Sequence, residues 1–437
     1  KPRIPTDEEL RRITTRAVAE IVPQREFVDG LLSGRSLRLK MGFDPTKPVI
    51  TLGWAVGLRK LRQLQDLGHT VVVIIGDWTA RIGDPSGQSQ TRAMLTAEEV
   101  QANSEAILRQ FYKVLDESRT EIRRQSEWFD GFTLTDVVRL AARVTVAQIL
   151  ERDDFAQRFA AHKPVGLHEL LYPLLQAYDS VAIEADVEFG GTDQKFNILL
   201  GRELQRAAGQ KAGPAGEGQA VLLVPLLVGL DGTQKMSQSL GNYIAIDDPP
   251  HEMYGKLMSI PDTLIMDYFQ LLTNVPDGEL ADIRKIVSAG GLGARDAKDR
   301  LAQTVVEWLH GQAAAQEAEE DFFSKFRTRV PPDVAFLVDV GPEGATPVEV
   351  SLSSSRLHSL PHLIQQAGLA SSVREARILI EQGAVEKFGQ MLGNEAKAIS
   401  RRPGERITQF KIALSDGDII RVGKHRFLHI VDADKRP

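Results

Sequence analysis

The pattern of apolar and polar positions predicts alternating strands and helices between residues 35 and 245. Residues 38–42 form a short predicted strand that ends in glycine, and residues 53–67 carry apolar side chains at helical spacing up to Gly68. The run at 70–75 is β-branched throughout, which is typical of a strand buried on both faces of a parallel sheet. Further strands are expected at 187–190 and 220–227. We therefore predict a doubly wound, Rossmann-like α/β domain with a parallel sheet.

Helical spacing dominates most of the remaining chain. It predicts an N-terminal helical segment (1–34), a largely helical insertion into the α/β domain (about 92–170) and an α-helical domain (246–345). Residues 346–355 belong to a stretch rich in Pro, Gly and Ser, which indicates a linker. Residues 356–437 then form a separate small α+β domain.

Composition narrows the class of protein. The chain has 437 residues, no cysteine, 53 Lys/Arg and 59 Asp/Glu, and hence a net charge of −6. The absence of cysteine excludes a disulfide scaffold, a thiolate metal site and a cysteine nucleophile. The longest apolar runs are far shorter than the ~20 residues that span a bilayer, and residues 1–9 carry no apolar signal core. We expect a cytoplasmic protein without membrane segments.

The charge is unevenly distributed. Residues 356–437 contain 14 Lys/Arg against 9 Asp/Glu, a balance of +5, which leaves −11 for the rest of the chain. A basic terminal domain on an acidic body suggests an anionic partner such as RNA, whose phosphates bind Lys and Arg. A solvated charged surface is the alternative.

Five polar motifs carry the candidate chemistry. Gly42-Phe-Asp-Pro-Thr46 and the stretch 76–87 follow predicted strands, where open α/β sheets bind ligands, although a plain turn would also fit. Tyr172, Gln176 and Asp179 share one helical face, which suits recognition of a small zwitterion with a hydroxyl group. The other two motifs are Gly-Gly-Thr-Asp-Gln at 190–194 and Lys-Met-Ser-Gln-Ser at 235–239.

In this order and spacing, the five motifs resemble those of bacterial tyrosyl-tRNA synthetases, which are class I aminoacyl-tRNA synthetases. The resemblance covers nearly the whole chain, and residues 371–385 resemble the S4-type RNA-binding module that closes bacterial members. It implies activation of tyrosine with ATP to tyrosyl-adenylate and transfer to tRNA(Tyr). It also implies Mg²⁺ carried by ATP, with no dedicated metal site on the protein, and a homodimer formed through the inserted helices.

The resemblance implies four groups of site residues. Tyrosine would be bound by Lys40, Thr79, Asp84, Tyr172, Gln176, Asp179 and Gln194, and Asp179 would accept a hydrogen bond from the phenol. ATP would be bound by Gly42, Asp44, Gly53, Gly191, Asp193 and Lys235. Catalysis would involve Thr46, Thr51, Trp54, Lys235, Ser237 and Ser239. RNA would be bound by Arg374, Arg377 and Lys387.

The sequence departs from the family pattern in three ways. Thr51-Leu-Gly-Trp54 replaces His-x-Gly-His, and Gln238 replaces the second lysine of Lys-Met-Ser-Lys-Ser. Lys40 stands where many relatives have a second phenol-binding tyrosine, and it would either reach the phenol oxygen or pair with a carboxylate. Losing one preorganised donor typically raises an activation barrier by ~2.7–4 kcal/mol. We therefore expect normal tyrosine binding and slowed activation.

Two alternatives stay open. A synthetase-like RNA-binding or regulatory protein with little or no adenylation activity would explain the replaced histidines. A generic nucleotidylyltransferase fits less well, because the basic terminal domain would have no role.

Overall fold

The computed structural model describes residues 2–85, 95–288, 292–327, 336–337, 348–352, 357–388, 405–407, 411–413, 418–422 and 426–432. Its contacts divide the chain into two compact units, Lys1–Glu319 and Glu320–Pro437, and each is described by itself. None of the described helices is long and apolar enough to cross a membrane.

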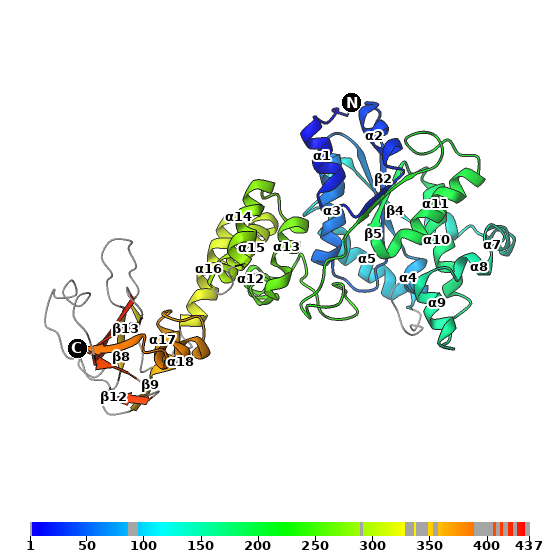
Figure 1. The fold of residues 1–437 in the computed structure, drawn as a ribbon. Helices are drawn as coiled ribbons and strands as arrows, with labels where there is room; N and C mark the ends of the chain where they lie inside the picture. The colour runs from blue at the N-terminus through cyan, green and yellow to red at the C-terminus, as the bar shows by residue number, and fades with distance from the viewer. Residues whose placement is uncertain are drawn as a thin grey trace. The chain divides into compact units, whose positions relative to one another are not determined.

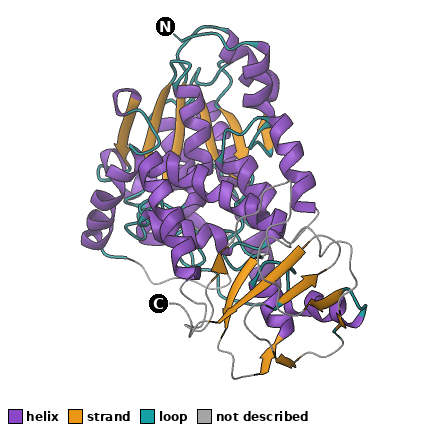
Figure 2. Ribbon diagram, turned by 90° about the vertical axis from the view of Figure 1, so that its left-hand side faces the viewer, coloured by secondary structure: helices purple, strands orange, loops and turns teal. Residues whose placement is uncertain are grey.

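The first unit is built on a six-stranded sheet with the order β1-β6-β5-β2-β3-β4 (Figures 1 and 2). Its strands are β1 (Glu20–Val22), β2 (Arg38–Phe43), β3 (Thr70–Ile75), β4 (Thr120–Arg124), β5 (Val187–Gly191) and β6 (Ala220–Val224). All neighbours are parallel except β1 and β6. Because β2 lies between β3 and β5, the strand order reverses beside it, and such a reversal opens a crevice at the carboxyl ends of the strands. The predicted doubly wound α/β fold is confirmed.

The best-predicted elements are those with strong burial patterns. Residues 71–75 of β3 are completely buried, as expected for its β-branched run. The predicted helix at 53–67 is α3 (Leu52–Gln65), and Thr51 caps it by accepting a hydrogen bond from the Trp54 backbone N–H. The last predicted strand ends early, at Val224, because Pro225 has no N–H to donate to the ladder.

Two strands lie in regions that were expected to be mainly helical. β1 interrupts the N-terminal segment between α1 (Asp7–Thr15) and α2 (Gln24–Leu32) and is only three residues long. β4 interrupts the region 92–170 and forms a sheet edge with the sequence Thr-Glu-Ile-Arg-Arg. A half-exposed edge strand can be polar, so neither sequence carries the apolar pattern that identifies a buried strand.

Apart from β4, the region 92–170 contains the helices α5 (Ala97–Phe111), α6 (Ser126–Phe129), α7 (Leu134–Ala141), α8 (Val146–Ile149) and α9 (Asp153–Ala160). Next come α10 (Tyr172–Ala182) and α11 (Lys195–Ala207), which pack on each other through Leu174, Ala177, Leu200 and Leu204. The short α4 (Thr79–Ile82) follows β3. α10 and α11 thus form a packed pair beside the crevice.

A helical region follows the sheet in the chain. It consists of α12 (Pro250–Ser259), α13 (Ile265–Leu272), α14 (Asp277–Ser288), α15 (Leu292–His310) and α16 (Gln312–Arg327). Contacts of α12, α13 and α14 with α15 bury Tyr254, Tyr268 and Phe269. The expected domain boundary at residue 345 lies outside the described residues, so that boundary stays a prediction. Of the expected linker (346–355), residues 348–352 are described, and they form a strand, β8 (Val348–Leu352).

The second unit combines sheet and helices. One sheet has the order β11-β10-β13-β14-β8-β7. Its strands are β7 (Phe336–Leu337), β8 (Val348–Leu352), β10 (Val385–Phe388), β11 (Glu405–Arg406), β13 (Ile419–Val422) and β14 (Arg426–Asp432), while β9 (Leu357–Ser359) pairs with β12 (Lys411–Ala413). α17 (Leu360–Gln366) and α18 (Val373–Glu381) share an apolar core with these strands. The architecture is α+β.

Candidate active site

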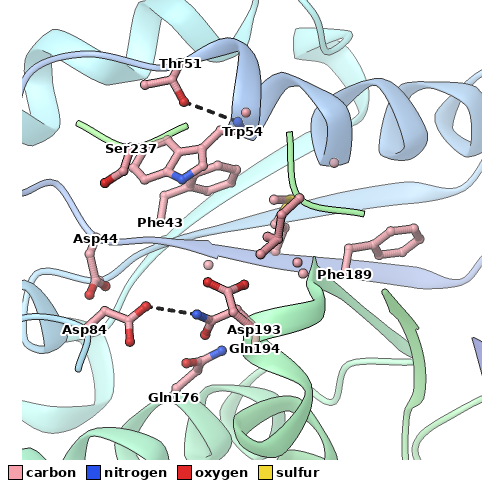
Figure 3. A pocket seen from close by; sticks show the side chains of 18 of the residues that line it. Phe43, Asp44, Thr51, Trp54, Asp84, Gln176, Phe189, Asp193, Gln194 and Ser237 are labelled. Atoms are coloured by element: carbon pink, nitrogen blue, oxygen red, sulfur yellow. Dashed lines mark hydrogen bonds between the residues drawn. The ribbon is translucent and has the colours of Figure 1, made fainter. Parts of the chain in front are cut away.

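A cavity of about 210 Å³ lies where β2, β3, β5 and β6 end, at the reversal of strand order (Figure 3). Every residue predicted to bind ATP or to act in catalysis lines this cavity, and so does every predicted tyrosine-binding residue except Lys40. The five sequence motifs are spread over residues 42–239, and the sheet topology brings them together.

Asp179 lines the cavity and is only 2% exposed. Its carboxylate accepts hydrogen bonds from Gln125 Nε2 (2.9 Å) and Trp128 Nε1 (3.2 Å). Burial raises the pKa of Asp179 to about 7, although nearby Lys40 and the bond from Gln125 pull it down. The two donors fix the carboxylate, and a carboxylate has lone pairs for a further donor that enters from the cavity.

Gln125 and Trp128 were not predicted as site residues. They follow β4, the polar edge strand that the apolar pattern did not reveal. Their position directly after a strand could have identified them, because residues just beyond the carboxyl end of a parallel strand face the crevice.

Asp44 is held between two elements. Tyr172 donates its phenol O–H to Asp44 Oδ2 (2.8 Å), and Thr79 donates to Asp44 Oδ1 (2.7 Å). Burial, with the Asp44 charge second, keeps the pKa of Tyr172 well above its ordinary value, so the phenol remains a neutral donor. Gly76 makes this approach possible, because a Cβ there would stand 2.2 Å from Asp44 Oδ1.

A chain of amide hydrogen bonds connects α10 with α11. Gln194 Nε2 donates to Asp84 Oδ2 (2.9 Å), and Asn197 Nδ2 donates to the side-chain oxygens of Gln176 (2.9 Å) and Gln194 (3.2 Å). Arg152 in turn donates to Asn197 Oδ1 (3.0 Å). Figure 3 shows Asp84, Gln176, Asp193 and Gln194 on one side of the cavity, with Thr51 and Trp54 on the other. Asn197 and Arg152 are supporting residues that no sequence motif marked.

Lys40 does not line the cavity. Its ammonium is completely buried and pairs with Glu188 (2.9 Å), which is 1% exposed. It also donates to the Gln176 backbone oxygen (2.9 Å) and to Ser180 Oγ (2.8 Å). Of the two roles considered from the sequence, Lys40 therefore pairs with a carboxylate, and its ammonium also holds α10 through Gln176 and Ser180.

The end of the cavity near Thr51 and Trp54 lies at the N-terminus of α3 (Figure 3). The Thr51 hydroxyl caps this helix, and the Trp54 ring packs edge-on against Phe43 with centroids 5.0 Å apart. Gly53 fits tightly, because a Cβ there would lie 3.3 Å from Thr51 Oγ1. The N-terminus of a 14-residue helix attracts anions through its free N–H groups and its dipole.

The loop at 235–239 closes this end. Lys235 forms an ion pair with Asp193 (2.5 Å), and the hydroxyls of Ser237 and Ser239 are 2.9 Å apart. Gln238 accepts a hydrogen bond from Thr46 Oγ1 (3.1 Å) and donates to the Val49 backbone oxygen. Lys47 Nζ also donates to the Gln238 backbone oxygen (2.7 Å), so the loop is tied to the segment after β2 by three hydrogen bonds.

The three predicted RNA-binding residues lie in the second unit. Arg374 and Arg377 are exposed, and their spacing places them on one face of α18. Lys387 on β10 is ion-paired with Asp418 (2.8 Å). Two of the three cations thus face solvent.

Comparison with known proteins assigns the chain to a family. The family described as "tRNA synthetases class I (W and Y)" matches residues 32–327, which contain all of the cavity's lining. The chain belongs to the class I tRNA synthetases of this family.

Relatives in this synthetase family match the chain over almost its full length. The tyrosine–tRNA ligase of Dehalococcoides mccartyi is 49% identical and covers 97% of this chain and 98% of its own. The tyrosine–tRNA ligase of Moorella thermoacetica is 47% identical, and the match covers 96% of this chain and 95% of that protein. A truncated mitochondrial tyrosyl-tRNA synthetase from Aspergillus nidulans matches 73% of this chain and 94% of its own with a TM-score of 0.60, and at 22% identity it supports the fold alone.

Proposed function

We propose that this synthetase is a tyrosine–tRNA ligase, which activates tyrosine with ATP and transfers it to tRNA(Tyr). The observation that carries the proposal is the buried Asp179, which lines the cavity and is fixed by two donors. A phenol O–H that enters the cavity would supply a third donor. Phenylalanine would leave the desolvated carboxylate short of a partner, which is costly.

The remaining polar groups suit the other parts of the substrate. Tyr172 and Gln176 precede Asp179 on α10 by about two turns and one turn, and Asp84 lines the same cavity; these three would hold the α-ammonium, while Gln194 would lie by the carboxylate. That carboxylate would attack the α-phosphorus of ATP in line. Such catalysis consists mainly of positioning and charge stabilisation.

The nucleotide would occupy the end beside α3. Gly42, Gly53 and Gly191 let the backbone approach ATP, and Asp193 would meet its ribose. Lys235, now paired with Asp193, would stabilise the pyrophosphate as it leaves. Among the described residues, no group of three or more His, Asp or Glu side chains is placed to hold a metal ion. We expect Mg²⁺ to be held by the phosphates of ATP, whose charge it neutralises.

We further propose that activation is slow. The Thr51 hydroxyl is engaged at the helix cap, and the Trp54 ring packs on Phe43, so both are poor substitutes for two imidazole donors. The same observation favours the second candidate function, an RNA-binding or regulatory protein with little adenylation activity.

The assembly would be a cytoplasmic homodimer. Five large apolar side chains of region 92–170 are strongly exposed, at 79, 59, 63, 64 and 80%: Leu134, Val138, Val146, Phe159 and Leu167. Large exposed apolar side chains are typical of a protein interface. We expect the chain to elute as a dimer in light scattering and Val138→Asp to shift it toward monomer; a monomeric parent chain would contradict the proposal.

Calorimetry with amino acids tests the proposed specificity. We expect tyrosine to bind and phenylalanine to bind at least about tenfold more weakly, because one hydrogen bond to a charged acceptor is lost. Equal affinities would refute the assignment of Asp179. Tyrosine binding without any adenylate formation would favour the second candidate function.

A further inference from the structure

A second cavity, of about 380 Å³, lies in the first unit and shares no lining residue with the active site. It is bounded by α1, the middle turns of α3, the end of α13 and Trp308 of α15. Val56, Arg59, Lys60 and Gln63 point from α3 into it, at the spacing of one helical face. The first turns of the same helix line the active-site cavity.

The charges around this cavity are unbalanced. Arg3 pairs with Glu9 (2.7 Å), Arg62 pairs with Asp66 (2.8 Å), and Arg16 has Asp277 at 3.6 Å. Among the described residues, Arg12, Arg59 and Lys60 form no ion pair with a carboxylate. Three of the cations that line the cavity therefore have no carboxylate partner among the described residues.

The three cations are held by neutral oxygens. Arg12 and Arg59 both donate to Asn274 Oδ1, at 3.2 and 3.0 Å, so their guanidinium groups converge on one atom. Arg59 also stacks 4.4 Å from the centroid of the Trp308 ring. Lys60 is 4% exposed and donates to the Ile13 backbone oxygen (3.0 Å) and to Gln63 Oε1 (3.1 Å).

The cations also affect one another electrostatically. Burial, and then the charges of Arg12, Arg16 and Arg59, lower the pKa of Lys60 to about 7. Burial lowers that of Arg59 to about 10, again with a contribution from Arg16 and Arg12. An anion in the cavity would raise both pKa values, since an opposite charge favours the charged form of each group.

We propose that this second cavity binds a small phosphate-bearing anion, inorganic phosphate or a diphosphate. Guanidinium forks match the oxygens of phosphate and bind them in a bidentate manner, and these charge-assisted bonds are strong. The buried ammonium of Lys60 supplies a point charge at the base of the cavity. The site is distinct from the one that would bind ATP, so its occupancy can be followed independently of catalysis.

Trp308 provides a local probe of binding. The fluorescence of the full chain is measured during titration with inorganic phosphate and, separately, with pyrophosphate, and the signal of a Trp308→Phe variant is subtracted. We expect pyrophosphate to change the difference signal in a saturable manner. An Arg12→Gln/Arg59→Gln variant should need at least about tenfold more ligand, since two charge-assisted bonds are lost.

Arg62→Gln is the matched control. It removes a cation from the same cavity, but one that is already neutralised by Asp66, and the affinity should stay within about twofold of the parent chain. Circular dichroism shows whether each variant is folded, and crystals of the parent chain soaked with pyrophosphate provide a readout that needs no variant. Phosphate density between Arg12 and Arg59 would support the proposal.

Three results would overturn it. One is the absence of any change in the difference signal at millimolar phosphate or pyrophosphate. The second is an equal affinity of the Arg12→Gln/Arg59→Gln variant. The third is a response to a short RNA strand but not to pyrophosphate, which would show that the cavity recognises a nucleic-acid backbone.

Discussion

Replacement of Asp179 by asparagine tests the basis of amino-acid recognition. Asp179 is 2% exposed and receives two donors, from Gln125 and Trp128, so the substrate phenol would be its third. Asparagine keeps one side-chain oxygen and brings an NH₂ group, which would face at least one of those donors. The variant therefore removes a charge-assisted hydrogen bond and adds an unfavourable contact between donors.

The magnitude follows from the kind of bond lost. A hydrogen bond to a charged group contributes ~1.5–3 kcal/mol, which corresponds to roughly 10- to 150-fold in the dissociation constant of tyrosine. Phenylalanine makes no such bond, so its weak affinity should change by less than about threefold, and the preference for tyrosine should largely disappear. Calorimetric titration of both amino acids measures the two effects.

Asp186→Asn is the control for general damage to the fold. Asp186 is also a buried carboxylate, 4% exposed, but it pairs with Arg35 and does not line the active-site cavity. This variant should lose stability and keep its tyrosine affinity. If Asp179→Asn retained the parent's preference for tyrosine over phenylalanine, the reasoning about Asp179 would be wrong.

Three further predictions concern protonation, activation and RNA. The pKa of Asp179 is raised to about 7 in the folded chain, so tyrosine affinity, measured by calorimetry, should fall as pH drops below 7. The folding stability that the protonated carboxyl contributes, measured by thermal unfolding, should be lost as pH rises from about 4 to 7. Both trends should vanish in Asp179→Asn. Thr51→His/Trp54→His should raise the rate of ATP–pyrophosphate exchange by at least about 100-fold, and an unchanged rate would refute the proposed impairment. Arg374→Glu/Arg377→Glu should weaken tRNA binding and reduce its salt dependence without changing tyrosine affinity, whereas undiminished tRNA affinity would argue against RNA contact by α18.

The sequence predicts best those elements in which buried apolar side chains recur at regular spacing or form a continuous run. β3 is identified by its β-branched run, and Tyr172, Gln176 and Asp179 share a face because helical spacing places them there. β4 escaped prediction because an edge strand with the sequence Thr-Glu-Ile-Arg-Arg has no apolar face to show. Its position in the chain alone could have suggested it.

Partners across the fold are harder to predict than elements. Both roles considered for Lys40 were chemically sound, and only the packing of β2 against β5 and α10 places its ammonium beside Glu188. Gln125, Trp128 and Asn197 reach the site from segments that carry no motif, so their contribution depends on tertiary contacts. Side chains that support other side chains leave little trace in a single sequence.

Tyrosine-dependent exchange of pyrophosphate into ATP, followed by charging of tRNA(Tyr), tests the central claim most directly. We predict that tyrosine supports exchange, that phenylalanine does not at comparable concentration, and that the chain charges tRNA(Tyr) with tyrosine. A folded chain that binds tRNA but shows no exchange with tyrosine, even after Thr51→His/Trp54→His, would contradict the assignment as a tyrosine–tRNA ligase.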